Sequence, residues 1–236
     1  IISMRDRTIS GFEALLRWRH RTRGAISPNE FIPLAEETGL IYELGQWVLM
    51  QACEQIAIWN QNKNEEEQLE ISINLSSRQF SDPNLVEGII GNIKKSGFNA
   101  ECLKLEITES ALMQNAQRSV NMLNQLKNLN IKVCVDDFGT GYSSLSYLHT
   151  FPIDTLKIDR SFVHDMSRNY RNMEIIRTII MLAHNLKLDV IAEGVETAEQ
   201  YAQLSALGCQ FAQGFYFARP VNKDDATLLI QQNQKW

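Results

Sequence analysis

The chain has 236 residues, of which 44% are hydrophobic and 22% are charged, enough for one large globular domain or two small ones. Its formal net charge of −5 argues against a protein that binds nucleic acid nonspecifically. No apolar run is long enough to cross a bilayer and no signal peptide is recognisable, so we expect a cytoplasmic protein with no membrane segment in this stretch.

The cysteines and the start of the sequence indicate the redox state and the domain context of the chain. The four cysteines are far apart and lack C-x-x-C spacing, which predicts reduced thiols in or near the core. The sequence opens at Ile1 in the middle of a strand-like pattern, so we expect residues 1–236 to be one domain from a longer protein.

Short apolar runs alternate with longer amphipathic segments along the chain. The spacing predicts strands over residues 8–18, 69–76, 102–110, 132–138, 155–162, 188–194 and 211–217. Several of these runs are almost entirely apolar, which is typical of parallel strands buried on both faces. The segments between them carry helix signals: a capping box from Ser27 to Glu30 with Pro28 inside it, a start at Asp82 with a stop at Gly97, and a second capping box over 197–200.

Repeated strand-then-helix units favour an α/β fold, either a (β/α)8 TIM-like barrel or an open doubly wound sheet. The length is near the ~250 residues typical of the barrel, and no G-x-G-x-x-G loop supports the open sheet. Residues 1–4 and the run from residue 8 are separated by only a few residues. Because a parallel crossover needs a dozen or more, we expect a barrel with one antiparallel strand.

Each of the seven predicted strands carries a polar side chain near its end. Taken singly, such residues are usually strand edges, salt-bridged acids or surface lysines. Together they would meet at the C-terminal mouth of a barrel, where burying several carboxylates without cations is very costly. The positions are Glu13, Asn74, Glu106, the pair Asp136 and Asp137, Lys157, Glu193 and Gln213.

The chemistry of these residues indicates which cation they would bind. Carboxylate and amide oxygens suit Mg²⁺ or Mn²⁺ better than Zn²⁺, and the four histidines show no metal-binding spacing. Two adjacent aspartates suggest two ions that share one carboxylate. Two ions ~3.5–4 Å apart are the usual device for in-line attack on a phosphodiester.

Seven ordered motifs run from one end of the chain to the other: "GFEALLRW", "INLSSRQF", "LEITES", "VDDFGTGYSSL", "LKIDRSFV", "IAEGVET" and "GCQFAQGFYFARP". With these motifs the chain resembles the EAL family of bacterial cyclic di-GMP phosphodiesterases. The resemblance implies a (β/α)8 barrel with an antiparallel strand. It also implies hydrolysis of cyclic di-GMP to linear pGpG with two Mg²⁺ or Mn²⁺ ions, inhibited by Ca²⁺.

The resemblance also assigns roles to individual residues. It implies a first metal bound by Glu13, Asn74, Glu106 and Asp136, and a second bound by Asp137 together with Asp136. Lys157 would orient the attacking water and the phosphate, and Glu193 would be a general base or a water-mediated metal partner. The remaining implied positions are Gln213 for a metal-bound water, Arg17 for the phosphate, Glu109 as the anchor of the loop with Gly139 and Gly141, and Glu196 as an outer acid.

Partners and alternatives follow from the same resemblance. We expect a homodimer through the edge after the glycine loop, where Tyr142, Leu145, Tyr147 and Leu148 lie, and an upstream sensor or GGDEF-type domain in the full-length protein. One alternative is a receptor that binds cyclic di-GMP without hydrolysing it. Another is a two-metal barrel that acts on a different phosphodiester.

Overall fold

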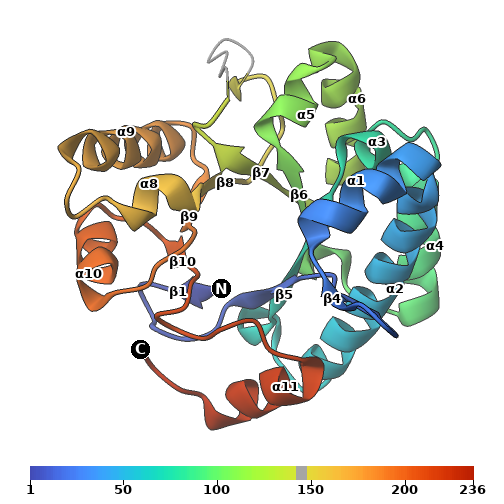
Figure 1. Ribbon diagram of the computed structural model, residues 1–236, viewed down its shortest axis with the longest axis horizontal. Coiled ribbons are helices and arrows are strands. Elements are labelled where there is room, and N and C mark those ends of the chain that lie inside the picture. The colour runs from blue at the N-terminus through green and yellow to red at the C-terminus, as the bar shows by residue number, and fades with distance from the viewer. Residues whose placement is uncertain (142–147) are drawn as a thin grey trace.

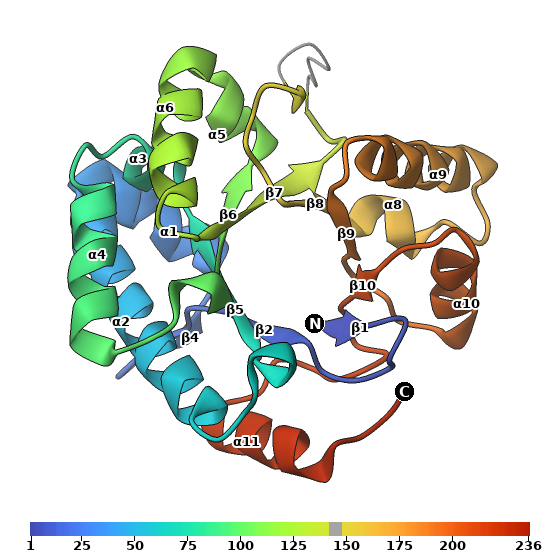
Figure 2. The same cartoon turned by 180° about the vertical axis from the view of Figure 1, so that it is seen from behind.

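The fold is described from a computed structural model, which defines residues 1–141 and 148–236. Eight strands form one sheet in the order β1-β10-β9-β8-β7-β6-β5-β2, and helices surround it (Figures 1 and 2). A single bridge between Ile2 and Ile9 joins the two ends of this sheet, so the barrel is nearly closed. The strands are β1 Ile2–Ser3, β2 Gly11–Ala14, β5 Glu70–Leu75, β6 Leu103–Thr108, β7 Lys132–Phe138, β8 Thr155–Ile158, β9 Asp189–Ala192 and β10 Phe211–Ala212.

The antiparallel strand predicted from the short N-terminal connection is confirmed. Strand β1 pairs antiparallel with β10, whereas all the other neighbours in the barrel sheet are parallel. The expected antiparallel contact with the run from residue 8 is also present, through the Ile2–Ile9 bridge and backbone hydrogen bonds such as that from the Ser3 amide to the Thr8 carbonyl. The α/β barrel class is therefore correct, and the reversed strand closes the ring.

The helices cover the outside of the barrel (Figure 1). The Ser27 cap and the Thr197 capping box are present, but Glu30 pairs with Arg23 instead of completing a box. The helix expected from Asp82 begins two residues later, after Asn84. The helices are α1 Pro28–Thr38, α2 Leu40–Asn60, α3 Ser77–Phe80, α4 Leu85–Ser96, α5 Glu109–Met113, α6 Ala116–Lys127, α8 Arg160–His164, α9 Tyr170–Asn185, α10 Ala198–Ala206 and α11 Lys223–Gln232, with short 3-10 turns η1 Glu65–Glu67 and η2 Ala100–Cys102.

Three predicted strands end at least four residues before the sequence pattern does. The run over 8–18 ends as a barrel strand at Ala14 and continues into a separate hairpin of β3 Trp18–His20 and β4 Gly24–Ile26. The run over 155–162 splits because Asp159 caps α8 and accepts a hydrogen bond from the Ser161 amide. Strand β10 keeps only two residues of the run over 211–217.

The apolar core lies between the strands and the surrounding helices. Outward-facing side chains of β6, β7 and β8 are fully buried there, among them Leu105, Val135 and Leu156. All four cysteines are free and buried, as expected. Among the described residues, no helix is both long and apolar enough to span a membrane. Leu148, expected on an exposed edge, is buried, whereas Tyr142, Leu145 and Tyr147 lie outside the described residues.

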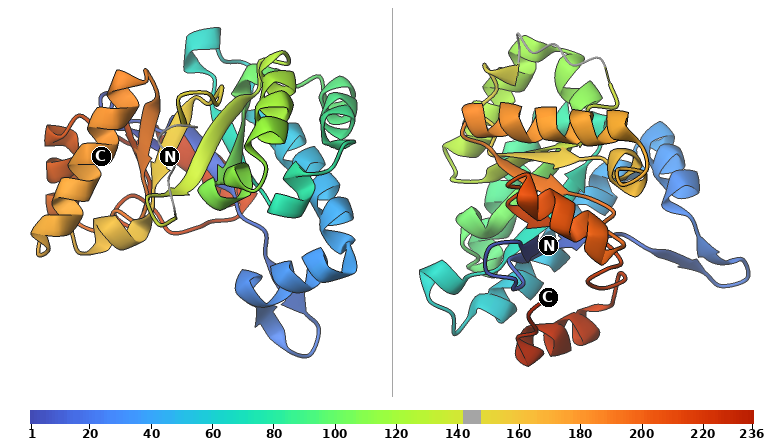
Figure 3. Two further views of the ribbon diagram at one scale, coloured as in Figure 1. Left: turned by 90° about the horizontal axis from the view of Figure 1, so that it is seen from above. Right: turned by 90° about the vertical axis from the view of Figure 1, so that its left-hand side faces the viewer.

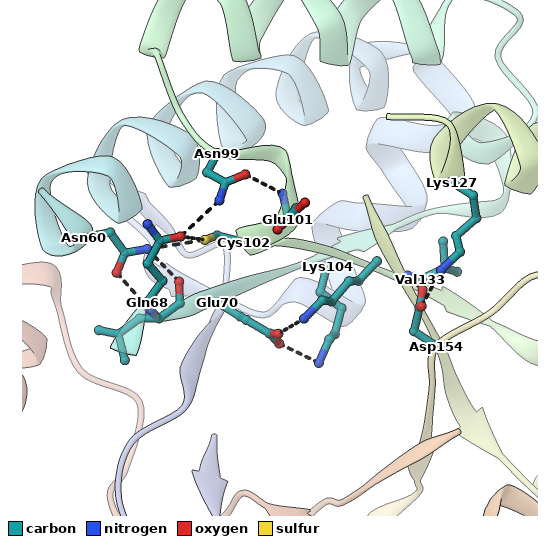
Figure 4. Close-up of polar contacts among 12 residues, drawn as sticks. Asn60, Gln68, Glu70, Asn99, Glu101, Cys102, Lys104, Lys127, Val133 and Asp154 are labelled. Carbon is teal, nitrogen blue, oxygen red and sulfur yellow. Dashed lines mark hydrogen bonds and ion pairs between the residues drawn. The ribbon is translucent and has the colours of Figure 1, made fainter. Parts of the chain in front are cut away.

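The inward-facing positions at the N-terminal end of the barrel carry charges rather than apolar groups (Figure 4). Lys104 is only 4% exposed, and its ammonium group lies 2.9 Å from the Glu70 carboxylate. Lys132 pairs with the other oxygen of Glu70. Burial alone would raise the pKa of Glu70, but the two lysines outweigh it and hold that pKa below its usual value. Glu70 therefore compensates a lysine that would otherwise be buried with an uncompensated charge.

Replacing Glu70 by glutamine should destabilise the fold in a pH-dependent way. A carboxyl group with a lowered pKa in the folded state stabilises above its unfolded pKa of about 4.3, and that stability is lost as the pH falls through the folded value. We expect Glu70→Gln to reduce the free energy of unfolding by about 1–3 kcal/mol at neutral pH, with a difference that shrinks in acid. Urea denaturation over a pH series measures this.

The exposed Glu66 in η1 provides the matched control for this substitution. Glu66→Gln makes the same chemical change without removing a buried partner, so its unfolding energy should stay near that of the unmodified chain. A Glu70→Gln variant as stable as the Glu66→Gln control at neutral pH would contradict the assigned role.

Candidate active site

The barrel mouth is organised around one buried ammonium group. Lys157 on β8 is 1% exposed, and its Nζ lies 2.6 Å from Glu106 Oε2 and 3.1 Å from Glu13 Oε2. The Asp136 carboxylate follows at 3.5 Å. These residues come from β2, β6, β7 and β8, so the parallel register brings side chains distant in sequence to one point. The predicted convergence of the strand ends is confirmed for these four.

Glu13 is the most highly bonded carboxylate in this group. Its Oε1 accepts a hydrogen bond from the Asn74 amide at 2.7 Å. Its Oε2 accepts one from the Gln213 amide at 2.8 Å in addition to the bond from Lys157. Strand ends on both sides of β2 therefore fix the orientation of this carboxylate.

The charge balance of the mouth perturbs the pKa values of its members. Burial alone would lower the pKa of Lys157, but the surrounding carboxylates hold it well above its ordinary value. Burial raises the pKa of Glu106 to about 7, and Lys157 only partly opposes this. Burial would also raise the pKa of Glu13, but Lys157 and two amide groups outweigh it and lower that pKa. One ammonium group thus does not neutralise all the carboxylates around it.

The adjacent aspartates of β7 reach the same mouth through a β-bulge. In a regular strand, Asp136 and Asp137 would point to opposite faces. The pairing of β7 with β8 shifts register between Val135 and Phe138, and Asp137 adopts a left-handed φ of 53°. Such bulges redirect side chains, and positive φ is tolerated by aspartate better than by most residues. Both carboxylates therefore belong to one cluster.

Glu193, which follows the end of β9, joins Asp136 and Asp137 in a second carboxylate cluster. The first cluster is the group of Glu13, Glu106 and Asp136 around Lys157. Carboxylate oxygens of Asp136, Asp137 and Glu193 all lie within 4.8 Å of one another, close enough to share a metal ion. Burial, reinforced by Asp136, raises the pKa of Glu193 to about 7, although Lys157 opposes the shift. Burial and the neighbouring Asp136 also raise the pKa of Asp137. The negative charge of this second cluster is therefore not balanced by positive side chains among the described residues.

Glu109 contacts the glycine loop that follows the aspartate pair. It begins α5, is 3% exposed, and its Oε2 accepts a hydrogen bond from the Gly139 amide at 3.3 Å. Gly139 has a φ of +95°, which favours glycine, and its neighbour Gly141 approaches the same carboxyl group. The expected contact between Glu109 and this loop is therefore present up to residue 141.

A cavity of about 870 Å³ opens beside the acidic clusters. Glu13, Glu193 and Gln213 line it, and so do the exposed side chains of Arg17 and Glu196. The Arg17 guanidinium donates a hydrogen bond to the Leu16 carbonyl and remains available to the cavity. Glu196 lies at the rim, where its backbone amide donates a hydrogen bond to Gln200 Oε1. Among the described residues, its carboxylate forms no ion pair with a member of the two clusters.

The donor set at the mouth fits hard divalent cations. All of its ligand atoms are carboxylate or amide oxygens, the type that Mg²⁺ and Mn²⁺ prefer. Within the described residues, the buried Oε1 of Glu106 has no hydrogen-bond partner. A buried carboxylate oxygen without a partner is expensive unless an ion or water satisfies it. Glu13, Asn74, Glu106 and Asp136, together with Asp137 and Glu193, are the residues that could hold such ions.

The sequence pattern missed three residues of this region. Asp159 lies close enough to Asp137 to raise its pKa, and its position two residues after Lys157 at a strand end could have signalled this. Arg160 and Arg219 line the cavity beside Arg17, although nothing in the periodicity distinguishes them from surface arginines. The backbone packs closely in this region: Gly194 leaves no room for a side chain against Arg160, and Gly214 none against the backbone of Val195.

Comparisons with known proteins agree with this geometry. Residues 1–220 match the EAL domain. The chain is 41% identical over 221 residues to the cyclic di-GMP phosphodiesterase NbdA of Pseudomonas aeruginosa, covering 94% of this chain and 28% of that protein. It is 42% identical over 211 residues to the bifunctional diguanylate cyclase/cyclic di-GMP phosphodiesterase MucR of the same organism, covering 89% of this chain and 30% of the relative.

The same likeness extends to solved structures. The structure of the MucR phosphodiesterase in complex with c-di-GMP superposes with a TM-score of 0.88 at 40% identity, covering 92% of this chain and 87% of that one. The chain spans less than a third of the length of either curated relative. The matched family covers most of the chain and includes every strand of the barrel, so this chain belongs to the EAL domain family.

Proposed function

We propose that this domain hydrolyses cyclic di-GMP to linear pGpG in a reaction that depends on two Mg²⁺ or Mn²⁺ ions. The observation that carries the proposal is the pair of carboxylate clusters around Lys157, in which no residue of the EAL metal set has been replaced. The names of the relatives and the c-di-GMP in a structure with 40% identity support the choice of substrate. The 870 Å³ cavity is large enough for a small-molecule ligand.

In this proposal, water adds to one phosphorus of the ring and the 3′ oxygen of the ribose leaves with a proton. The cations, held by Glu13, Asn74, Glu106, Asp136 and Asp137, would supply Lewis-acid stabilisation of the phosphate and of the nucleophile. Lys157 remains protonated and presents its charge to the phosphate oxygens. The guanidinium of Arg17 orients the phosphate from the cavity wall.

Glu193 is suited to receive the proton of the attacking water. Its carboxylate borders the cavity and lies within 4.8 Å of the carboxylates of Asp136 and Asp137, so it would face a water beside the cations. Gln213 holds the Glu13 carboxylate and borders the same space, so it would position water beside the phosphate. Glu196, at the rim, would act as an outer acid. Ca²⁺, which is larger and accepts looser coordination, would bind without supporting turnover.

We expect purified protein with Mn²⁺ to convert cyclic di-GMP to pGpG, and substitution of Ca²⁺ to stop the reaction. Ion-exchange chromatography of the nucleotides measures substrate and product directly. A protein that binds cyclic di-GMP but releases no pGpG would instead be a receptor. Turnover of other cyclic or linear dinucleotides without cyclic di-GMP turnover would indicate a different phosphodiesterase.

Removing one carboxylate from the mouth should abolish turnover and weaken metal binding. We expect Asp136→Asn to lower kcat at least about 100-fold, because this residue belongs to both carboxylate groups. Titration calorimetry with Mn²⁺ alone should give a lower affinity or fewer bound ions, independently of activity. The exposed Glu199 on α10 supplies the control Glu199→Gln, which should change neither property. Unchanged Mn²⁺ binding by Asp136→Asn would contradict the assignment.

The hydrogen bond between Glu109 and the Gly139 amide should affect how tightly the second ion binds, because Gly139 lies two residues after Asp137. We expect Glu109→Ala to lower turnover most at limiting Mg²⁺ and less at saturating Mg²⁺. Glu109→Gln, which keeps an oxygen acceptor for the Gly139 amide, should retain more activity. Equal Mg²⁺ dependence of both variants and the unmodified protein would make Glu109 a scaffold residue.

The proposal extends to assembly and context. We expect a homodimer formed through the edge after the glycine loop, and an upstream sensor or GGDEF-type domain in the full-length protein. The domain would act in the bacterial cytoplasm, where cyclic di-GMP is a second messenger. Sedimentation of the purified domain tests the dimer.

A further inference from the structure

A strongly basic hairpin lies beside the cavity of this otherwise acidic chain. Between Glu13 and Glu30 the sequence contains four arginines and no carboxylate, although the whole chain has a formal net charge of −5. The hairpin of β3 and β4 carries most of these arginines. Figure 3 shows it projecting from the body of the barrel, at the same end as α8. Because α8 follows the C-terminal end of β8, this is the end where the mouth opens.

The packing of the hairpin leaves the guanidinium groups of Arg19 and Arg21 exposed to solvent. Trp18 meets His20 and Phe31 of α1 edge to face, with ring centroids 5.8 Å apart in both cases. Because neighbouring residues of a strand point to opposite faces, Arg19 points away from this aromatic contact. Arg19 and Arg21 are exposed, and neither forms an ion pair with a described residue.

The other basic residues of the region differ in their surroundings. Arg23 is already compensated, because its guanidinium lies 2.7 Å from Glu30. Arg17 lines the cavity together with Arg160 and Arg219, all with exposed side chains. The arginines of the hairpin therefore follow directly on Arg17 in the sequence, whereas the cavity lining itself mixes arginines with the carboxylates of Glu13, Glu193 and Glu196.

This separation of charge matters for a ligand that is an anion. A cyclic dinucleotide carries two phosphate charges, and both the net charge of the chain and the carboxylates of the mouth repel it at a distance. Guanidinium groups on a projecting element produce an attractive field outside the cavity. That field extends about 8 Å at physiological ionic strength and acts on the rate of encounter more than on the chemistry.

We propose that the β3–β4 hairpin guides the anionic dinucleotide into the cavity through the uncompensated charges of Arg19 and Arg21. This proposal rests on the proposed function, because it takes the same phosphodiester as ligand. Neither arginine lines the cavity. Their contribution is therefore to the association rate constant, and kcat depends on other residues.

The double variant Arg19→Gln/Arg21→Gln tests this role. Stopped-flow measurement with fluorescently labelled cyclic di-GMP gives the association rate constant over about 0.02 to 0.5 M salt. We expect the rate constant to fall about 3- to 10-fold at low salt, with the difference vanishing at high salt and kcat unchanged. The variant Arg19→Lys/Arg21→Lys should retain most of the rate, because guidance requires charge and not the forked geometry of arginine.

The matched control is Lys94→Gln/Lys95→Gln in the last turn of α4. Both lysines are exposed, and α4 runs back towards the start of β6, at the opposite end of the barrel. This variant has the same change in net charge, so guidance by the hairpin predicts a much smaller effect on association.

Several outcomes would overturn the proposal. Equal effects of the two double variants would mean that net charge alone acts. A loss that persists at high salt, or that lysine does not restore, would assign the arginines to direct contact or to folding. An unmodified protein that hydrolyses cyclic di-GMP at an association rate independent of salt would refute guidance and leave the proposed function standing. An unmodified protein that neither binds nor hydrolyses it would refute both.

Discussion

The buried ammonium group of Lys157 is the interaction on which the mouth of the barrel depends. It lies within 3.5 Å of carboxylate oxygens from three other strands, and it is almost completely shielded from water. Removing it would leave Glu13, Glu106 and Asp136 to repel one another in a medium where charge is poorly screened. Even with it in place, the pKa of Glu106 rises to about 7, so the site still favours additional positive charge. The need for cations is thus built into the packing of the strands.

The second constraint is local and concerns the backbone of β7. A regular strand could present only one of the two neighbouring aspartates to the mouth, and the other would face the helices. The register shift and the positive φ of Asp137 remove this conflict, so both carboxylates reach Glu193. The same irregularity starts the glycine loop that Glu109 holds through Gly139. The position of the second cluster and that of the loop therefore depend on one departure from strand geometry.

Sequence periodicity revealed the barrel because its strands are short apolar runs with polar residues near their ends. It placed β5, β6 and β7 nearly residue for residue, and it identified the reversed strand from the length of one connection. It failed where a tertiary contact decides the outcome. Asp159 turns a strand-like run into a helix by capping α8, and β10 gives way after Ala212 to a segment in which Gly214 packs against the backbone of Val195. The bulge in β7 could not be predicted either, since no residue type specifies a register shift.

Charge is distributed along the barrel axis in a way that composition could not reveal. Glu70 with its two lysines lies at the N-terminal end, and the carboxylates around Lys157 lie at the mouth. The neighbouring cavity is lined by Arg17, Arg160 and Arg219 as well as by Glu13, Glu193 and Glu196. Carboxylate clusters attract cations, whereas guanidinium groups attract anions. A phosphodiester that reacts with the help of divalent ions needs both. A uniformly acidic mouth would bind the ions but repel the nucleotide, and a uniformly basic one would do the reverse. The arginines beside the carboxylate clusters allow both kinds of ligand to be attracted to one region of the barrel.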